Sequence, residues 1–145
     1  MNNKLYKLGI DIGSTTVKIA ILNKDNDILF SDYERHFANI QDTLASLLLK
    51  AKELLGDIKV NPVITGSGGL TLANHLNVPF NQEVVSVASA LEYYAPKTDV
   101  AIELGGEDAK IIYFGKSIEQ RMNGTCAGGT GAFLDQMASL LHTDT

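Results

Sequence analysis

The chain has 145 residues, of which 45% are hydrophobic and 20% are charged, and its formal net charge is -5. This composition supports a packed core and argues against wholesale disorder. The negative charge argues against nucleic acid as a partner, because phosphate backbones require clustered Lys and Arg. No apolar run reaches membrane-spanning length and no export signal precedes the first strand pattern, so the expected location is the cytoplasm. With Cys126 as its single cysteine, the chain cannot form an internal disulfide.

The N-terminal residues carry the pattern of three strands. Apolar residues alternate over residues 8–12 and again over residues 17–21, which is typical of half-buried strands. The polar residues 23–27 predict a hairpin turn, and a third strand is expected near residues 28–36.

A helix and a shorter strand–helix pair follow. Apolar residues recur at helical spacing over residues 40–54, with Asn39 as the expected N-cap and Gly56 as the expected stop. Residues 61–65 predict a short strand, which leads through the glycine-rich residues 66–69 into a short helix.

The second part of the chain begins with a helix expected over Glu83–Tyr94 and ended by Pro96. A last helix is expected over residues 129–141. Between these helices three strands are predicted, the last two joined by a turn at residues 115–116: Val100–Leu104, Ala109–Phe114 and Ile118–Met122. Strands and helices in this order are typical of an α/β fold with a mixed sheet.

An internal repeat is the strongest structural signal. Residues 9–18 (GIDIGSTTVK) align without a gap on residues 101–110 (AIELGGEDAK), each copy reading as strand, small-residue hairpin and strand. The alignment pairs acid with acid, glycine with glycine and lysine with lysine: Asp11 with Glu103, Gly13 with Gly105, and Lys18 with Lys110. We therefore expect two equivalent halves, residues 1–96 and residues 97–145. The second half is incomplete, so the sequence is expected to be part of a longer protein.

The repeated residues point to phosphate chemistry. A carboxylate at the end of an apolar strand is costly unless it is paired or solvated, as Asp11 and Glu103 would be in a cleft. Either acid alone is more simply a capped acid in a turn, but two equivalent ones favour a shared role. Tight glycine turns bind anions through their N–H groups, and the acids would hold Mg²⁺ mostly through water. The candidate phosphate-binding residues are Gly13, Ser14, Thr15, Thr16, Lys18, Gly105, Gly106 and Asp108. The two lysines either add positive charge or extend from a strand edge into solvent.

These motifs resemble those of known ATPases. Residues 11–16 (DIGSTT) and 103–108 (ELGGED) resemble the two phosphate motifs of the actin, sugar-kinase and chaperone ATPase superfamily, whose fold is ribonuclease H-like. Residues 122–134 (MNGTCAGGTGAFL) are similar to the signature M-N-x-x-C-A-[AG]-G-T-G-x-F-L of the BadF/BadG/BcrA/BcrD family of acyl-CoA dehydratase activators. Residues 105–114 (GGEDAKIIYF) and 126–133 (CAGGTGAF) suggest the long, multidomain form of these activators.

The resemblance implies an ATPase that acts as an activase. Members of that family are homodimers that hold one four-iron four-sulfur cluster between the subunits, with two cysteines from each. ATP hydrolysis changes the shape of the dimer, and an electron received from a donor such as ferredoxin or flavodoxin passes on to a 2-hydroxyacyl-CoA dehydratase. By this resemblance Asp11 and Glu103 order the metal and the attacking water, and Cys126 is the first cluster ligand. The second ligand would lie beyond Thr145.

Two alternatives for Cys126 follow from its surroundings. It precedes a predicted helix, whose positive end favours a thiolate and an anionic cluster. It could instead be a small buried residue in a glycine-rich corner. Two positions depart from the family pattern: Glu103 replaces the usual Asp, and Glu107 stands where Gln is common in the shorter activators.

Other functions stay open on the sequence alone. A sugar or acyl kinase of the same superfamily would share both phosphate motifs but would have no use for the cysteine signature. A non-catalytic module that docks partners inside a larger protein is the second alternative. Residues 65–69 (TGSGG) either approach the nucleotide or form a plain strand-to-helix turn. The three histidines, His36, His75 and His142, are expected to be structural or surface residues, because no second ligand stands at metal spacing.

Overall fold

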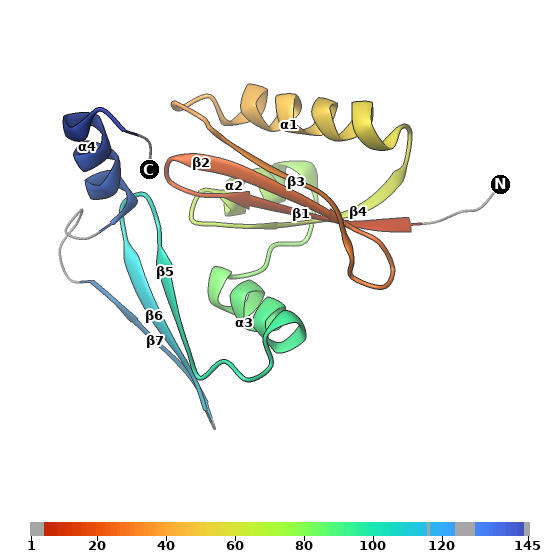
Figure 1. Ribbon diagram of the computed structural model, residues 1–145. Helices are drawn as coiled ribbons and strands as arrows, with labels where there is room; N and C mark the ends of the chain where they lie inside the picture. Colours follow the sequence, from red (N-terminus) through yellow and green to blue (C-terminus); the bar gives the residue numbers. More distant parts are fainter. Residues whose placement is uncertain (1–4, 116, 124–129, 144–145) are drawn as a thin grey trace. The chain divides into compact units, whose positions relative to one another are not determined.

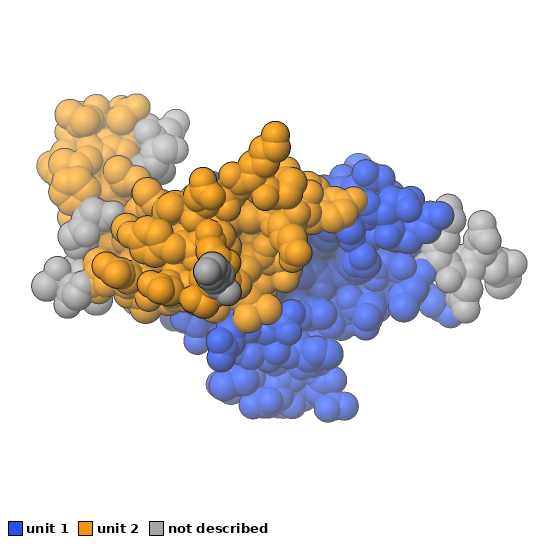
Figure 2. Space-filling view, turned by 90° about the horizontal axis from the view of Figure 1, so that it is seen from below, with its two compact units in different colours: residues 1–83 blue, residues 84–145 orange. Residues whose placement is uncertain are grey.

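The computed structural model describes residues 5–115, 117–123 and 130–143. Cys126 and its neighbours in residues 124–129, here called the cysteine segment, lie outside the described residues. The chain forms two compact units, residues 1–83 and residues 84–145 (Figure 2). The boundary near Pro96 that the sequence suggests for the two repeated halves stays a prediction.

The first unit contains a mixed four-stranded sheet with the strand order β3-β2-β1-β4. β1 pairs antiparallel with β2, which pairs antiparallel with β3, whereas β4 runs parallel to β1. Two helices complete the unit, and α1 lies along one face of the sheet (Figure 1). The elements are β1 (Leu5–Ile12), β2 (Thr16–Leu22), β3 (Ile28–Arg35), α1 (Ile40–Leu55), β4 (Lys59–Thr65) and α2 (Gly69–Leu76).

The core of the first unit lies between this sheet and α1. Alternation directs Leu8, Ile10 and Ile12 of β1 to the same face, and these side chains are 0–5% exposed. Helical spacing brings Leu44 and Leu47 of α1 onto that face. Burial of each such side chain contributes about 1.5–3 kcal/mol. This packing fixes the end of β1, where Asp11 lies.

The second unit contains an antiparallel three-stranded sheet with the order β5-β6-β7. One helix precedes this sheet in the sequence and another follows it. Ile112 in the central strand is fully buried. The last helix begins at Gly131 with Thr130 as its N-cap, so it starts two residues later than expected, and residue 129 lies outside the described residues. The elements are α3 (Glu83–Tyr94), β5 (Val100–Leu104), β6 (Ala109–Phe114), β7 (Ile118–Met122) and α4 (Gly131–Leu141).

All the strands and helices expected from the sequence are present, with ends that differ by a few residues. Among the helices that the structure describes, none has the length and apolarity needed to cross a membrane.

Candidate functional site

The two repeated motifs form hairpins with the same main-chain geometry. In the first hairpin (residues 11–18), the N–H of Gly13 donates to the carbonyl of Thr16 at 2.9 Å. In the second hairpin (residues 103–110), the equivalent N–H of Gly105 donates to the carbonyl of Asp108 at 2.8 Å. The repeat in sequence is therefore also a repeat in structure.

The acid and the lysine of each motif are directly opposite each other across their hairpin. Asp11 is in register with Lys18, and Glu103 is in register with Lys110. Side chains of directly opposed residues lie on the same face of a sheet and close together. The seven-residue separation of acid and lysine in the sequence thus becomes an ion pair in both hairpins.

The first hairpin carries its ion pair near solvent. Lys18 Nζ lies 2.9 Å from Asp11 Oδ2, and the two side chains are 50% and 33% exposed. Exposed pairs of this kind contribute little to stability and exchange partners readily. Both groups are therefore available to a ligand.

The glycine-rich residues 66–69 pack against the first hairpin. Gly66 has a φ of +97°, and a Cβ at this position would stand 2.5 Å from Asp11 Oδ1. The N–H of Gly68 donates to the carbonyl of Ile12 at 2.9 Å. These residues form the turn from β4 to α2, and only glycine permits that turn to lie so close to the Asp11 carboxylate.

His36 supports the first hairpin from its other side. The His36 side chain is buried, and its main-chain N–H donates to the carbonyl of Thr15 at 3.1 Å. Nδ1 accepts a hydrogen bond from the N–H of Ala38, which assigns the proton to Nε2, and Nε2 lies 3.3 Å from the carbonyl of Gly13. His36 thus has the structural role expected from the sequence, and that role is to hold the turn at Gly13.

The second hairpin differs from the first in the burial of its lysine. Lys110 is only 7% exposed and lies between two carboxylates, 3.3 Å from Asp108 Oδ2 and 3.7 Å from Glu103 Oε1. Of the two roles left open for this lysine, extension into solvent does not occur. Asp108 folds back over Gly105, where a Cβ would collide with its carboxylate.

The first turn of α4 is bonded to the tip of the second hairpin. The N–H of Gly131 donates to the carbonyl of Gly105 at 2.8 Å, and the N–H of Ala132 donates to the carbonyl of Gly106 at 3.1 Å. The carbonyl that Gly131 engages is thus equivalent to the carbonyl of Gly13 that faces His36.

The predicted site residues therefore form two groups, one in each unit. The first contains Asp11, Gly13, Ser14, Thr15, Thr16 and Lys18; the second contains Glu103, Gly105, Gly106, Asp108 and Lys110. Cys126 lies outside the described residues. The contacts of Gly66 and His36 with the first hairpin arise from tertiary packing, and the turn expected as one alternative for residues 65–69 is the one that brings Gly66 to Asp11.

The donor set suits a hard cation more than a soft one. Within the described part of the chain, no group of three or more His, Cys, Asp or Glu residues is placed to hold a metal ion. The two hairpins instead offer single carboxylates beside main-chain turns. Such a site fits Mg²⁺, which retains most of its waters and binds through one or two carboxylates and phosphate oxygens.

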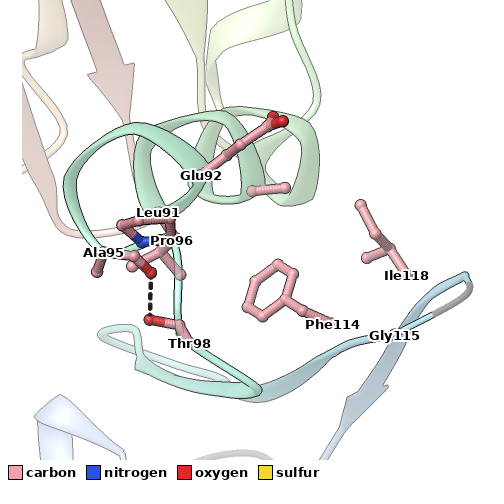
Figure 3. A pocket seen from close by; sticks show the side chains of 9 residues that line it. Leu91, Glu92, Ala95, Pro96, Thr98, Phe114, Gly115 and Ile118 are labelled. Carbon is pink, nitrogen blue, oxygen red and sulfur yellow. Dashed lines mark hydrogen bonds between the residues drawn. The ribbon is translucent and has the colours of Figure 1, made fainter.

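A separate pocket of about 300 Å³ lies in the second unit, between α3 and the β6–β7 turn (Figure 3). Phe114 and Ile118 line it from the sheet, and Leu91 and Glu92 line it from α3. Among the lining residues that the structure describes, Glu92 is the one charged group. Because this described lining carries a carboxylate and no cation, the hairpins are the candidate site for a phosphate.

Comparison with known proteins decides the family. The model of the BadF/BadG/BcrA/BcrD ATPase family matches residues 8–145. The chain belongs to the BadF/BadG/BcrA/BcrD ATPase family. Its member from Clostridioides difficile, a 2-hydroxyisocaproyl-CoA dehydratase activator, is 32% identical over 146 residues, which cover 97% of this chain and 54% of the relative. The chain spans about half the length of the curated relatives that it matches.

Two solved structures of the BadF/BadG/BcrA/BcrD type resemble this chain. Component A of the Acidaminococcus fermentans (R)-2-hydroxyglutaryl-CoA dehydratase has a TM-score of 0.82 at 27% identity, covering 97% of this chain and 55% of that one. The activator of the 2-hydroxyisocaproyl-CoA dehydratase from Clostridium difficile, with bound ADPNP, has a TM-score of 0.74 at 32% identity, covering 96% and 53%. These likenesses confirm the α/β fold of the actin, sugar-kinase and ATPase type.

Proposed function

We propose that this chain carries the two phosphate-binding hairpins of an ATP-dependent activator of a 2-hydroxyacyl-CoA dehydratase. The observation that carries the proposal is the pair of equivalent hairpins, each with an acid opposite a lysine and a glycine at the turn. Membership of an ATPase family, relatives named as dehydratase activators and a relative solved with bound ADPNP support it.

In this proposal both hairpins bind phosphates of one nucleotide. Turn N–H groups and the hydroxyls of Ser14, Thr15 and Thr16 bind phosphate oxygens, because donors in tight turns form anion-binding concavities. Lys18 leaves Asp11 and binds a phosphate. In the second hairpin the main-chain N–H groups of Gly106 and Asp108 bind phosphate oxygens. Gly105 shapes the turn through its bond to the carbonyl of Asp108, and Lys110 stays with its two carboxylates.

The hydrolytic step uses Asp11 and Glu103. Mg²⁺, when bound with the nucleotide, neutralises charge on the phosphates, and the two carboxylates hold its water shell. They also orient the water that attacks the terminal phosphate. Because positioning and charge supply most of the catalysis of phosphoryl transfer, a shift of either carboxylate is enough to slow it. In this proposal, nucleotide binding and hydrolysis drive a closure movement of the two units.

Cys126 belongs to the second part of the proposal. An iron–sulfur cluster requires four thiolates, and this chain has one cysteine, so it supplies at most one ligand per copy. We propose that a longer dimeric protein completes the set and delivers an electron to the dehydratase from a ferredoxin or flavodoxin. The residues that the structure describes include no cysteine.

The hydrolytic roles are tested by Asp11→Asn and Glu103→Gln in a protein long enough to hydrolyse ATP. Each substitution keeps the size of the side chain and removes its charge, so we expect kcat to fall by about 10²-fold or more with the fold intact. Steady-state phosphate release at saturating Mg-ATP measures this loss. Glu119→Gln, at an exposed position of β7 outside the hairpin, is the matched control and should stay within about threefold of the parent. Full activity in both site variants contradicts the proposal.

The cysteine role is tested by anaerobic purification of the same longer protein with and without Cys126→Ala. We expect a brown protein with iron and acid-labile sulfide, and loss of both in the variant, because thiolates are the cluster ligands. A colourless parent protein counts against the activator function but leaves ATP hydrolysis at the hairpins standing.

A further inference from the structure

The two repeated halves differ where their third strand leaves the hairpin. In the first unit the β2–β3 ladder continues to the tip of the hairpin, as far as the pair Thr16 and Arg35. In the second unit the β6–β7 ladder ends at the pair Lys110 and Met122, which corresponds to Lys18 and Tyr33. β7 therefore leaves its hairpin two residues earlier than β3 does.

A side chain completes the ladder at the point where β7 leaves. The main-chain N–H of Asn123 donates to the carbonyl of Ala109 at 3.0 Å, as a strand residue would. The return bond is made by the side chain, because the N–H of Ala109 donates to Asn123 Oδ1 at 3.1 Å. In an antiparallel ladder every second pair of opposed residues exchanges two main-chain hydrogen bonds, and Ala109 with Asn123 stands at such a position. The Asn123 amide oxygen thus replaces the main-chain oxygen.

Ala109 is a sensitive place for such a bond. It directly follows Asp108, whose carbonyl accepts the N–H of Gly105 and so closes the turn. It directly precedes Lys110, which holds Glu103 and Asp108. A bond at Ala109 therefore holds the main chain between Asp108 and Lys110 in place, and Lys110 in turn contacts Glu103.

Described residues on both sides of the cysteine segment are bonded to the same hairpin. Asn123 precedes the segment and contacts Ala109, while Gly131 and Ala132 follow it and contact Gly105 and Gly106. A Cβ on Gly131 would stand 3.1 Å from the carbonyl of Gly105, so the second attachment depends on a glycine. A displacement of the hairpin consequently acts on both Asn123 and the first turn of α4.

We propose that Asn123 is a positioning residue of the second hairpin, which its side-chain oxygen fixes at Ala109, and that it couples nucleotide bound there to the segment bearing Cys126. The inference rests on the proposed function for its nucleotide, but the positioning of the hairpin by Asn123 does not.

Hydrogen exchange tests the positioning without any ligand. Asn123→Ala removes the acceptor, whereas Asn123→Asp keeps an oxygen in its place. In Asn123→Ala we expect the amides of residues 105–110 to exchange faster by about fivefold or more, and those of residues 13–18 to keep their rates. Asn123→Asp should exchange like the parent chain. Gln120→Ala, at an exposed site of β7, is the control for loss of any side chain from this strand.

The coupling is read from Cys126, which serves as a built-in reporter because the chain has one cysteine. Its rate of reaction with a thiol reagent is measured with and without millimolar Mg-ADPNP. We expect the nucleotide to change the rate by about threefold or more in the parent chain and in Asn123→Asp, and to leave it unchanged in Asn123→Ala. Nucleotide binding to each variant is verified by NMR titration.

The outcomes separate the two proposals. An equal nucleotide response in Asn123→Ala and the parent chain, or unchanged exchange at residues 105–110, overturns the inference about Asn123. Faster exchange in Asn123→Ala supports the positioning role even if nucleotide fails to bind the parent chain. In that case the coupling is measured in the longer protein used for ATP hydrolysis, and failure of that protein to bind nucleotide contradicts the proposed function alone.

Discussion

Three charged side chains of the first unit form ion pairs between α1 and β3. Lys50 on α1 lies 2.9 Å from Asp32 Oδ2 and 2.6 Å from Glu34 Oε1, both on β3. The hydrogen bond from Lys50, with a weaker one from the N–H of Tyr33, lowers the pKa of Asp32 below its ordinary value. The bonds to Glu34 and then Asp32 raise the pKa of Lys50. The ion pairs of Lys50 with Asp32 and Glu34 therefore form at pH values where both carboxylates are ionised and the lysine is protonated.

Removal of Lys50 should release the Asp32 carboxylate. In Lys50→Met we expect the pKa of Asp32, followed by NMR, to rise toward its ordinary value of 3.8. Because the folded-state pKa is the lower one, this stabilisation is present above pH 3.8 and is lost as the pH falls through the folded value. The effect on unfolding is small, since all three side chains remain in contact with water. Lys24→Met is the control and should leave the Asp32 titration unchanged.

The contacts of individual residues in the candidate site could be predicted from the sequence only in part. The repeat was enough to predict that Asp11 and Glu103 are equivalent and that each has a lysine nearby. It could not predict that Lys110 is buried between two carboxylates while Lys18 is half exposed. Burial depends on residues from other parts of the chain, which a ten-residue pattern does not contain. For the same reason the proximity of Gly66 to Asp11 could not be predicted.

At the scale of elements, the two sheets differ in what covers them. α1 covers the face of β1 that carries Leu8, Ile10 and Ile12. The repeat aligns these with Val100, Ile102 and Leu104 of β5, which are 45%, 69% and 54% exposed. Alternation predicted both strands correctly, because it reports which side chains share a face. It does not report whether a helix covers that face.

This difference predicts unequal losses of stability for equivalent substitutions. Ile10→Ala removes methyl groups from a side chain that is 4% exposed and should cost about 2–4 kcal/mol. Ile102→Ala changes a side chain that is 69% exposed and should cost less than about 1 kcal/mol. Urea unfolding followed through the amide signals of each sheet measures both values, since the two units need not unfold together. Equal losses would show that the β5 face is covered in solution.

In the whole molecule, the proposed function requires the hairpins of both units to bind one nucleotide. The fold class followed from the two repeated glycine hairpins, and the family followed from the cysteine signature in residues 122–134. The number of residues needed for tight binding could not be predicted in this way. We expect these 145 residues to bind ATP weakly or not at all, since adenine contacts should come from a region outside them. Calorimetry that gives a micromolar or tighter dissociation constant would contradict this expectation.

The most direct measurement is an NMR titration of the isotope-labelled chain with Mg-ATP into the millimolar range. If both hairpins bind the phosphates of one nucleotide, the amide signals of Gly13–Thr16 and Gly105–Asp108 shift together along curves with a single dissociation constant. Asp11→Asn should then weaken the response of both hairpins. A response of one hairpin without the other, or two separate dissociation constants, would contradict a nucleotide site shared by both hairpins.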